Sequence, residues 1–420
     1  MEDRPTTPDS SAPERPTGGT HPNGRTESTL PASPAPTDFP RASHHVPPSL
    51  RIRDRIARKK RALLPMQWQQ SYSLYTSMWF ASHFAVIYTL GRLAIDDIPT
   101  GAARRHVDNF FSPQDCVEFM RFTRDQIVLM LELLMVPAII RTECGFVVGG
   151  REALCVLLYR LAFPCCLKDM RLDFGLSESC ICETFNWMLH FMDFKWGFLL
   201  SLDVQRLVPK LRTFAEAVYN KGCPLTHCWA FIDGTVRGIA RPIRNKRFFY
   251  NGYKRKHAIK FQGVVTPDGL FVDLYDAEVG TTHDGYLLAE STLLEKLQTH
   301  MNSPSGHPYC VYGDPAYGQT DHIQCPFSAS VNGPLTPAMR KFNKSMSQCR
   351  VTVEWGFKEM TSKWAFVDMK CQQKFLLSPV ATQYKVATLL SNFHSCLNGG
   401  NQISQYFGVE PPTLEEYLKV

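Results

Sequence analysis

The spacing of apolar residues changes near residue 222 of this 420-residue chain. From Pro113 to Val208, apolar residues recur every three or four positions, which predicts a group of packed helices. After residue 224, short apolar runs alternate with turn signals and helical stretches, which predicts strands interleaved with helices. We therefore expect an all-α N-terminal region followed by an α/β domain, in which helices flank a mixed sheet.

Composition extends this division to both ends of the chain. Residues 1–50 contain 11 of the 29 prolines and almost no large aliphatic side chains, so we expect a disordered Pro/Ser/Thr-rich tail. The other expected segments are a basic and helical segment at 51–110, a helical domain at 111–222, the α/β domain at 223–400 and a C-terminal tail at 401–420. The sequence leaves open whether this last tail packs on the core or hangs free.

A candidate helix-turn-helix lies within residues 167–190. Gly175 supplies a tight turn, and Ser177 is a good N-cap for a second helix. Such a helix can enter the DNA major groove, but this one has no Lys or Arg before Lys195, which is poor for phosphate contact. A structural helix bundle is the alternative.

The formal net charge of +7 favours acidic partners. Residues 51–61 carry seven Lys or Arg against one Asp, which is typical of a nuclear-import or phosphate-contact patch and also of a solvated helix face. Residues 71–91 have no formal charge, but polar residues interrupt them, so we expect a helix on a soluble core and no membrane span. No apolar stretch follows Met1, so we expect no signal peptide, and we predict a location in the nucleus.

Two predicted strands end in a carboxylate. The run "HCWAFIDGT" reaches Asp233 and the run "YCVYGD" reaches Asp314, with a hairpin around "TPDG" and a helix between them. A further predicted helix carries Glu354 in its middle. If the two strands are neighbours in one sheet, their carboxylates meet, and the helix can deliver the third.

Three carboxylates around one point repel one another unless cations lie between them. Hard oxygen ligands select Mg²⁺ or Mn²⁺, and two such ions suit phosphodiester chemistry. Each acid alone also has an ordinary interpretation: Asp233 as half of an Asp-Gly turn, and Glu354 as the helical partner of Arg350 and Lys358. Asp284 either lies near the metals or caps the helix that begins there, and we favour capping.

A basic segment follows Asp233. Residues 237–260 contain nine Lys or Arg and no Asp or Glu, with Phe and Tyr interleaved. Cations follow phosphates and aromatic rings stack on bases, so we expect DNA binding here; a solvated loop with core aromatics is the alternative. The candidate DNA contacts are Arg244, Lys246, Arg247, Lys254, Arg255, Lys256, His257 and Lys260.

Several of these motifs occur in a familiar order. "FIDGT", "RPIRNKRFFYNGYKRKHAIKFQGVVTPDGLFVDLYDAEVG", "HD", "YGDPAY" and "NKSMSQCRVTVEWGF" together resemble the DDE endonuclease domain of PIF/Harbinger-type transposases over residues 227–370. Two details differ, because Val236 stands where a polar residue is common and Thr281-Thr282 stand where basic residues are frequent.

The resemblance implies a ribonuclease-H-like fold and a catalytic, metal-binding triad of Asp233, Asp314 and Glu354. It also implies DNA as substrate, DNA strand cleavage and joining, and often a separate Myb-like DNA-binding protein as partner. We therefore predict a divalent-metal-dependent DNA nuclease or transposase. The alternatives are a nuclease that never joins strands and a domesticated DNA-binding or scaffold protein. The target sequence and the oligomeric state, a homo-oligomer included, stay open.

Overall fold

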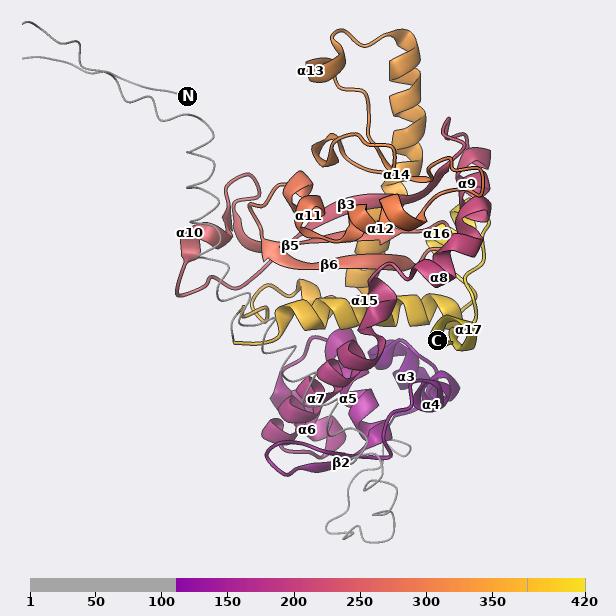
Figure 1. Cartoon of the computed structure of the whole chain (residues 1–420). Coiled ribbons are helices and arrows are strands. Elements are labelled where there is room, and N and C mark those ends of the chain that lie inside the picture. The colour runs from indigo at the N-terminus through magenta and orange to yellow at the C-terminus, as the bar shows by residue number, and fades with distance from the viewer. Residues whose placement is uncertain (1–110, 376, 420) are drawn as a thin grey trace, which may run out of the picture. The chain divides into compact units, whose positions relative to one another are not determined.

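The computed structural model describes residues 111–375 and 377–419 (Figure 1). The expected tail at 1–50 and the segment at 51–110, with its stretches at 51–61 and 71–91, lie outside the described residues. Among the helices that the model does describe, none combines the length and the apolar character that crossing a bilayer requires.

Helices predominate before residue 222, as predicted. They are α3 (Pro113–Met120), α4 (Arg124–Leu133), α5 (Gly150–Ala162), α6 (Leu167–Phe174), α7 (Glu178–Trp196), α8 (Val204–Leu207) and α9 (Leu211–Asn220). The region is not all-α, however, because β1 (Ile139–Arg141) pairs with β2 (Val147–Gly149) as an antiparallel hairpin. Each strand has three residues, which is too short to show an alternating pattern in the sequence.

The predicted helix-turn outline at 167–190 is confirmed, but its second helix is a core element. Gly175 ends α6 with a φ of 66°, and the Ser177 hydroxyl accepts a hydrogen bond from the Cys180 N–H at 3.2 Å. Ten residues of α7, from Cys180 to Trp196, are buried, and the helix contacts α5 and α15 (Val380–Leu397). Because so little of α7 is exposed, the structure favours the bundle interpretation over DNA reading.

The predicted mixed sheet is confirmed. Its path is β4 (Tyr250–Asn251), β5 (Lys256–Val265), β3 (Cys228–Gly238), β7 (Cys310–Tyr312) and β8 (Ile323–Gln324), with β6 (Phe271–Val279) also paired to β5. The β3–β5 and β5–β6 ladders are antiparallel, whereas β7 runs parallel to both β3 and β8. The β5–β6 hairpin turns at the predicted position, where the Gly269 N–H donates to the Thr266 carbonyl at 2.9 Å.

Helices cover both faces of this sheet. The other elements after β3 include α10 (Lys246–Phe249), α11 (Asp284–Glu290), α12 (Leu293–His300), the 3-10 turn η3 (Pro315–Tyr317), α13 (Ala329–Asn332), α14 (Pro337–Lys363), α15, α16 (Gln402–Phe407) and α17 (Leu414–Leu418). Phe231 of β3 joins the core formed with α14 and α15, whereas the next residue, Ile232, joins a second core with α9 and α12. Successive strand residues point to opposite faces, so one strand serves both cores.

The C-terminal segment packs on the core rather than hanging free. Ile403 and Phe407 of α16 and Leu414 and Leu418 of α17 are buried. Tyr417 is buried as well, and its hydroxyl accepts a hydrogen bond from the Asn392 amide on α15 at 2.9 Å. The question that the sequence left open about residues 401–420 is therefore answered for the described part, which ends at residue 419.

Candidate active site

Asp233 and Asp314 follow the same point of two adjacent parallel strands. In the β3–β7 ladder Phe231 lies opposite Tyr312; Asp233 comes two residues later within β3, and Asp314 comes two residues after the end of β7. The expectation that the two carboxylate-bearing strands are neighbours is thus confirmed. Asp233 is not a turn residue, however, because β3 continues to Gly238 and Asp233 pairs with Gly263 of β5.

Local packing fixes Asp314 beside β3. Its carboxylate accepts a hydrogen bond from the Ala316 N–H at 2.9 Å and so caps η3. A side chain on the preceding Gly313 would come within 2.7 Å of Ile232 and 2.8 Å of Tyr317. Only glycine fits at position 313, where β7 ends against β3. Asp314 is therefore the first residue after β7 that can carry a carboxylate.

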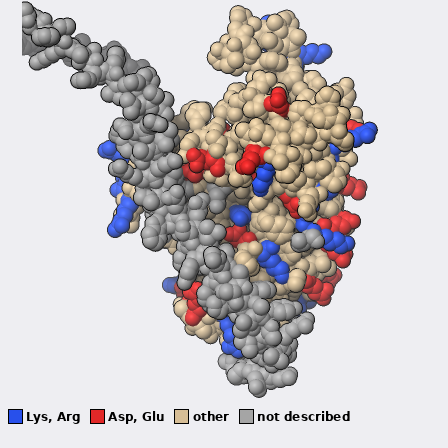
Figure 2. All heavy atoms as spheres, viewed as in Figure 1, with Lys and Arg blue, Asp and Glu red and all other residues tan. Residues whose placement is uncertain are grey.

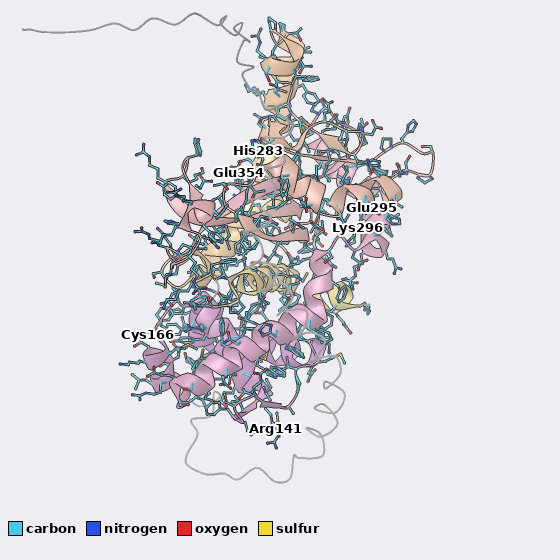
Figure 3. All side chains as sticks on the ribbon, turned by 60° about the vertical axis from the view of Figure 1, so that its left-hand side comes forward. Arg141, Cys166, His283, Glu295, Lys296 and Glu354 are labelled. Carbon is cyan, nitrogen blue, oxygen red and sulfur yellow. The ribbon has the colours of Figure 1, made fainter. Side chains whose placement is uncertain are left out.

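Glu354 reaches the same region from α14, which packs on β3 and β5. Arg350, one turn earlier, contacts two acids at once: its Nη2 lies 2.9 Å from Glu354 Oε1 and its Nη1 lies 3.4 Å from Asp233 Oδ2. The predicted Arg350–Glu354 pair is therefore present, but it is no isolated surface pair. Figure 3 labels Glu354 together with His283, which precedes α11 on the neighbouring part of the site.

Burial raises the pKa of Asp233 to about 6, and the opposing charge of Arg350 only limits this rise. The carboxylates of Glu354 and Asp284 raise the pKa further, so both carry negative charge close to Asp233. A buried acid with like charges around it gains from any added cation. This electrostatic arrangement is what a divalent metal would neutralise.

Asp284 belongs to this region through a contact that the sequence did not predict. Its Oδ1 lies 2.7 Å from the Lys260 Nζ, and a methyl group on Gly234 would come within 2.0 Å of the same oxygen. The N-cap of α11 is His283, and Asp284 is the first residue of the helix, so the capping interpretation is wrong. The His-Asp pair after β6 was the available signal, but only the fold shows that α11 begins beside β3.

The structure separates the predicted DNA contacts into three groups. Lys260 is buried, holds Asp284 and donates to the Thr282 carbonyl at 3.2 Å, so it is not available to a phosphate. Lys256 and His257 are half-buried. The exposed members are Arg244, Lys246, Arg247, Lys254 and Arg255.

The aromatic residues of the basic segment are divided in the same way. Phe249 is buried and packs on Phe375, with ring centroids 5.0 Å apart, which fits the core alternative. Tyr253 is 89% exposed and Tyr250 is 44% exposed, so these two rings are free to meet a ligand. The aromatic residues of this segment therefore lie partly in the core and partly on the surface.

The sequence analysis missed one cation of this basic surface. The pKa of His257 is lowered by burial and then by the positive charges of Arg241, Lys370 and Lys246. Lys370 comes from beyond η4 (Ala365–Asp368), more than a hundred residues after Arg241. No local pattern could reveal this addition, because the fold alone brings the two segments together.

The carboxylates of Asp233, Asp314 and Glu354 are suitable ligands for a hard divalent cation, but they do not surround a common point in this structure. Among the described residues, no three His, Cys, Asp or Glu side chains form a group with the geometry of a metal site. Arg350 separates Asp233 from Glu354, and Asp314 is occupied with its own cap. Metal binding at these three acids therefore requires at least that Arg350 move aside.

Comparison with known proteins gives one family match, in the α/β part of the chain. Residues 232–392 match the family model described as DDE superfamily endonuclease. The match covers 161 of the 420 residues, since it runs from 232 to 392 inclusive, and it contains Asp233, Asp314 and Glu354. No curated protein and no solved structure matches the chain. The match suggests a transposase-derived nuclease domain, whose family implies a DNA substrate and generally uses divalent metals.

Proposed function

We propose that this protein is a divalent-metal-dependent DNA nuclease of the PIF/Harbinger transposase type, with a ribonuclease-H-like α/β domain. The observation that carries the proposal is the register of β3 and β7, in which Phe231 pairs with Tyr312, so that Asp233 and Asp314 each come two residues after this pair. Glu354 is the third acid, tied to Asp233 through Arg350. The match of residues 232–392 to the DDE superfamily endonuclease model supports the same class.

In this mechanism Asp233, Asp314 and Glu354 would hold the metal ions. Two Mg²⁺ or Mn²⁺ ions would, when bound, activate a water or a DNA 3′-hydroxyl and stabilise the leaving oxygen of the phosphodiester. Burial of Asp233 lowers the local dielectric and so strengthens its hold on a cation. Arg350 neutralises the negative charges of Asp233 and Glu354 while no metal is bound. If a metal took its place, the guanidinium group of Arg350 would be free to bind a phosphate.

The DNA substrate lies, in this proposal, along the exposed basic surface. Lys246, Lys254 and the added Lys370 supply positive charge, and Tyr253 offers a ring for base stacking. Figure 2 shows Lys and Arg side chains projecting at the edge that carries α10 in Figure 1. Because most of α7 is buried, we propose that a separate Myb-like DNA-binding protein supplies sequence recognition. We also propose that the nuclease acts in the nucleus. It would act as a homo-oligomer when it joins two DNA ends.

A domesticated DNA-binding or scaffold protein is the second candidate. The observation that favours it is the ion pairing of Arg350 with Asp233 and Glu354, since a cation of the protein itself can satisfy acids that no longer bind metal. The intact set of three acids favours the nuclease.

The deciding experiment is a nicking assay with the full chain on supercoiled DNA, in Mg²⁺ or Mn²⁺. Asp314→Ala and a chelator should both abolish cleavage. Lys358→Ala is the matched control on α14, because Lys358 is exposed and forms no ion pair among the described residues. DNA binding without cleavage in either metal would support the domesticated binder, and cleavage that survives Asp314→Ala would refute the proposed active site.

A further inference from the structure

The first turns of α14 project beyond the sheet (Figure 1). Every fully buried residue of α14 lies at or after Met346, and the side chains of residues 337–345 of this 27-residue helix are exposed or only half-buried. A helix in a protein usually draws its stability from packing one face against a neighbour. The projecting end therefore needs an explanation other than the core.

The preceding segment holds one face of this end in place. The Asn343 amide accepts from the Phe327 N–H at 2.9 Å and donates to the Phe327 carbonyl at 2.8 Å. The Phe342 ring packs on Phe327, with centroids 5.1 Å apart, and on Tyr312 of β7, with centroids 6.5 Å apart. We call residues 327–345 the α14 arm, and these contacts make it a braced projection rather than a loose loop.

The opposite face of the α14 arm is cationic. At about 100° per residue, Arg340, Lys341 and Lys344 point away from the side that carries Phe342. All three cations are exposed, and none of them has an ion-pair partner among the described residues. In the view of Figure 2, the projecting end shows blue side chains and no red ones.

The surrounding sequence lacks the acids that would neutralise these cations. No Asp or Glu occurs between Asp321 and Glu354, an interval of 32 residues. A solvated helix face normally mixes both signs of charge, since i, i+4 pairs support an exposed helix. A surface of one sign, held rigid and exposed, is instead complementary to a polyanion.

One edge of the cationic face points to the same side of α14 as Glu354. Arg340 precedes Glu354 by 14 residues, close to four helical turns, so the two lie about 40° apart around the helix axis, whereas Lys344 lies about 80° from Glu354. At about 1.5 Å per residue, the distance along the helix to Glu354 is about 21 Å from Arg340 and about 15 Å from Lys344. Duplex DNA advances about 3.4 Å per base pair, so these lengths correspond to about four to six base pairs.

Building on the proposed function, we propose that the α14 arm is a second DNA-binding surface, distinct from the basic segment at 237–260. Its Arg340 and Lys344 side chains contact phosphates of duplex DNA within about six base pairs of the phosphodiester that is cut. The occupant is nucleic acid rather than a second protein, because the exposed face presents cations and its large apolar residue, Phe342, is turned toward Phe327 and Tyr312.

The test measures DNA binding without cleavage. The full chain with Asp314→Ala is titrated, in chelator, onto a fluorescein-labelled duplex of mixed sequence at several salt concentrations. The test variant adds Arg340→Gln/Lys344→Gln, which keeps helix propensity, and the matched control adds Arg141→Gln/Arg212→Gln, two exposed cations outside the arm. We expect the test variant to reduce the slope of log K against log salt by about 1.8, since each lost phosphate contact removes about 0.9. The control slope should not change, and Arg340→Lys/Lys344→Arg should retain the wild-type slope.

An unchanged slope in the Gln variant, with an unchanged circular dichroism melt, overturns the proposal. So does loss of self-association in light scattering at unchanged DNA affinity, because the arm would then be a contact between copies. Phosphate-ethylation interference on the cut substrate tests the placement, and contacts beyond about six base pairs from the nick contradict it. The binding readout does not depend on cleavage, so a reduced slope with no nicking would retain the arm and reject the nuclease.

Discussion

The Nη1 atom of Arg350 lies 3.4 Å from the Oδ2 atom of Asp233, so a cation of the protein itself occupies the approach to the most buried of the proposed catalytic acids. The same guanidinium holds Glu354 at 2.9 Å. The three side chains form one compensated group, in which Arg350 satisfies the acids that a metal would need. Metal binding and the Arg350 contact are therefore in competition for the same carboxylate oxygens.

Replacing Arg350 with methionine should tighten Mn²⁺ binding to the DNA-free protein. The Arg350 and Asp233 side chains are 22% and 21% exposed, so we assign their interaction only about 1 kcal/mol, or about fivefold in affinity. Electron paramagnetic resonance of free Mn²⁺ measures this directly and does not require activity. Lys358→Met, one turn beyond Glu354, is the matched control and should leave the affinity unchanged. Weaker Mn²⁺ binding in Arg350→Met would mean that the arginine organises the acids instead of competing for them.

The buried pair of Lys260 and Asp284 makes a second prediction, about stability. Their side chains are 10% and 20% exposed, so removing Asp284 leaves a buried ammonium group without its partner. We expect Asp284→Ala to lower the free energy of unfolding by about 3 kcal/mol, and the double variant with Lys260→Met to recover much of this loss. Urea denaturation measures both values.

The exposed ion pair of Arg212 and Glu216 is the control for the Lys260 and Asp284 variants. It has the same 2.7 Å separation, but its side chains are 84% and 58% exposed. Arg212→Ala and Glu216→Ala should each cost less than about 1 kcal/mol. If Asp284→Ala costs no more than these surface changes, the Lys260–Asp284 pair does not support the site.

A third prediction concerns pH. Burial raises the pKa of Asp273 in β6 to about 7, although Lys296 and Lys385 act to lower it. Because the folded pKa lies above the unfolded value of 3.8, this group contributes stability at low pH that is lost as the pH rises from about 4 to about 7. Asp273→Asn should remove the loss, which is at most about 4 kcal/mol.

Thermal melts of wild type and Asp273→Asn between pH 4 and pH 8, in chelator, test this expectation. The stability difference between the two proteins should grow in favour of the variant as the pH rises. Asp321→Asn changes an exposed carboxylate and serves as control. A difference that is constant with pH would show that Asp273 does not titrate in this window.

These contacts also show which features of the fold and the site can be predicted from the sequence. The two strands and the three candidate acids can be predicted from apolar runs that reach Asp233 and Asp314 and from a helix around Glu354, all of which are local signals, whereas the strand order comes from the structure. The role of Lys260 does not follow, because its charge resembles that of its exposed neighbours and only the position of α11 buries it. The start of α14 at Pro337 does not follow from the sequence pattern either, because the first turns of this helix lack the apolar period that a packed helix shows.

The last prediction concerns Tyr253, which is 89% exposed on a basic surface and lies next to Lys254, with the Nζ atom 5.1 Å from the ring centroid. A ring that buries almost nothing contributes little to folding, so Tyr253→Ala should leave the melting temperature unchanged. If the ring stacks on a base, the same variant should weaken binding of a single-stranded oligonucleotide by about 1 kcal/mol or more, which is about fivefold. Fluorescence anisotropy in chelator measures this, and Tyr219→Ala, with a ring 50% exposed on α9, is the control. Equal affinities for the Tyr253→Ala variant and wild type would leave phosphate contact as the only role of residues 237–260 in DNA binding.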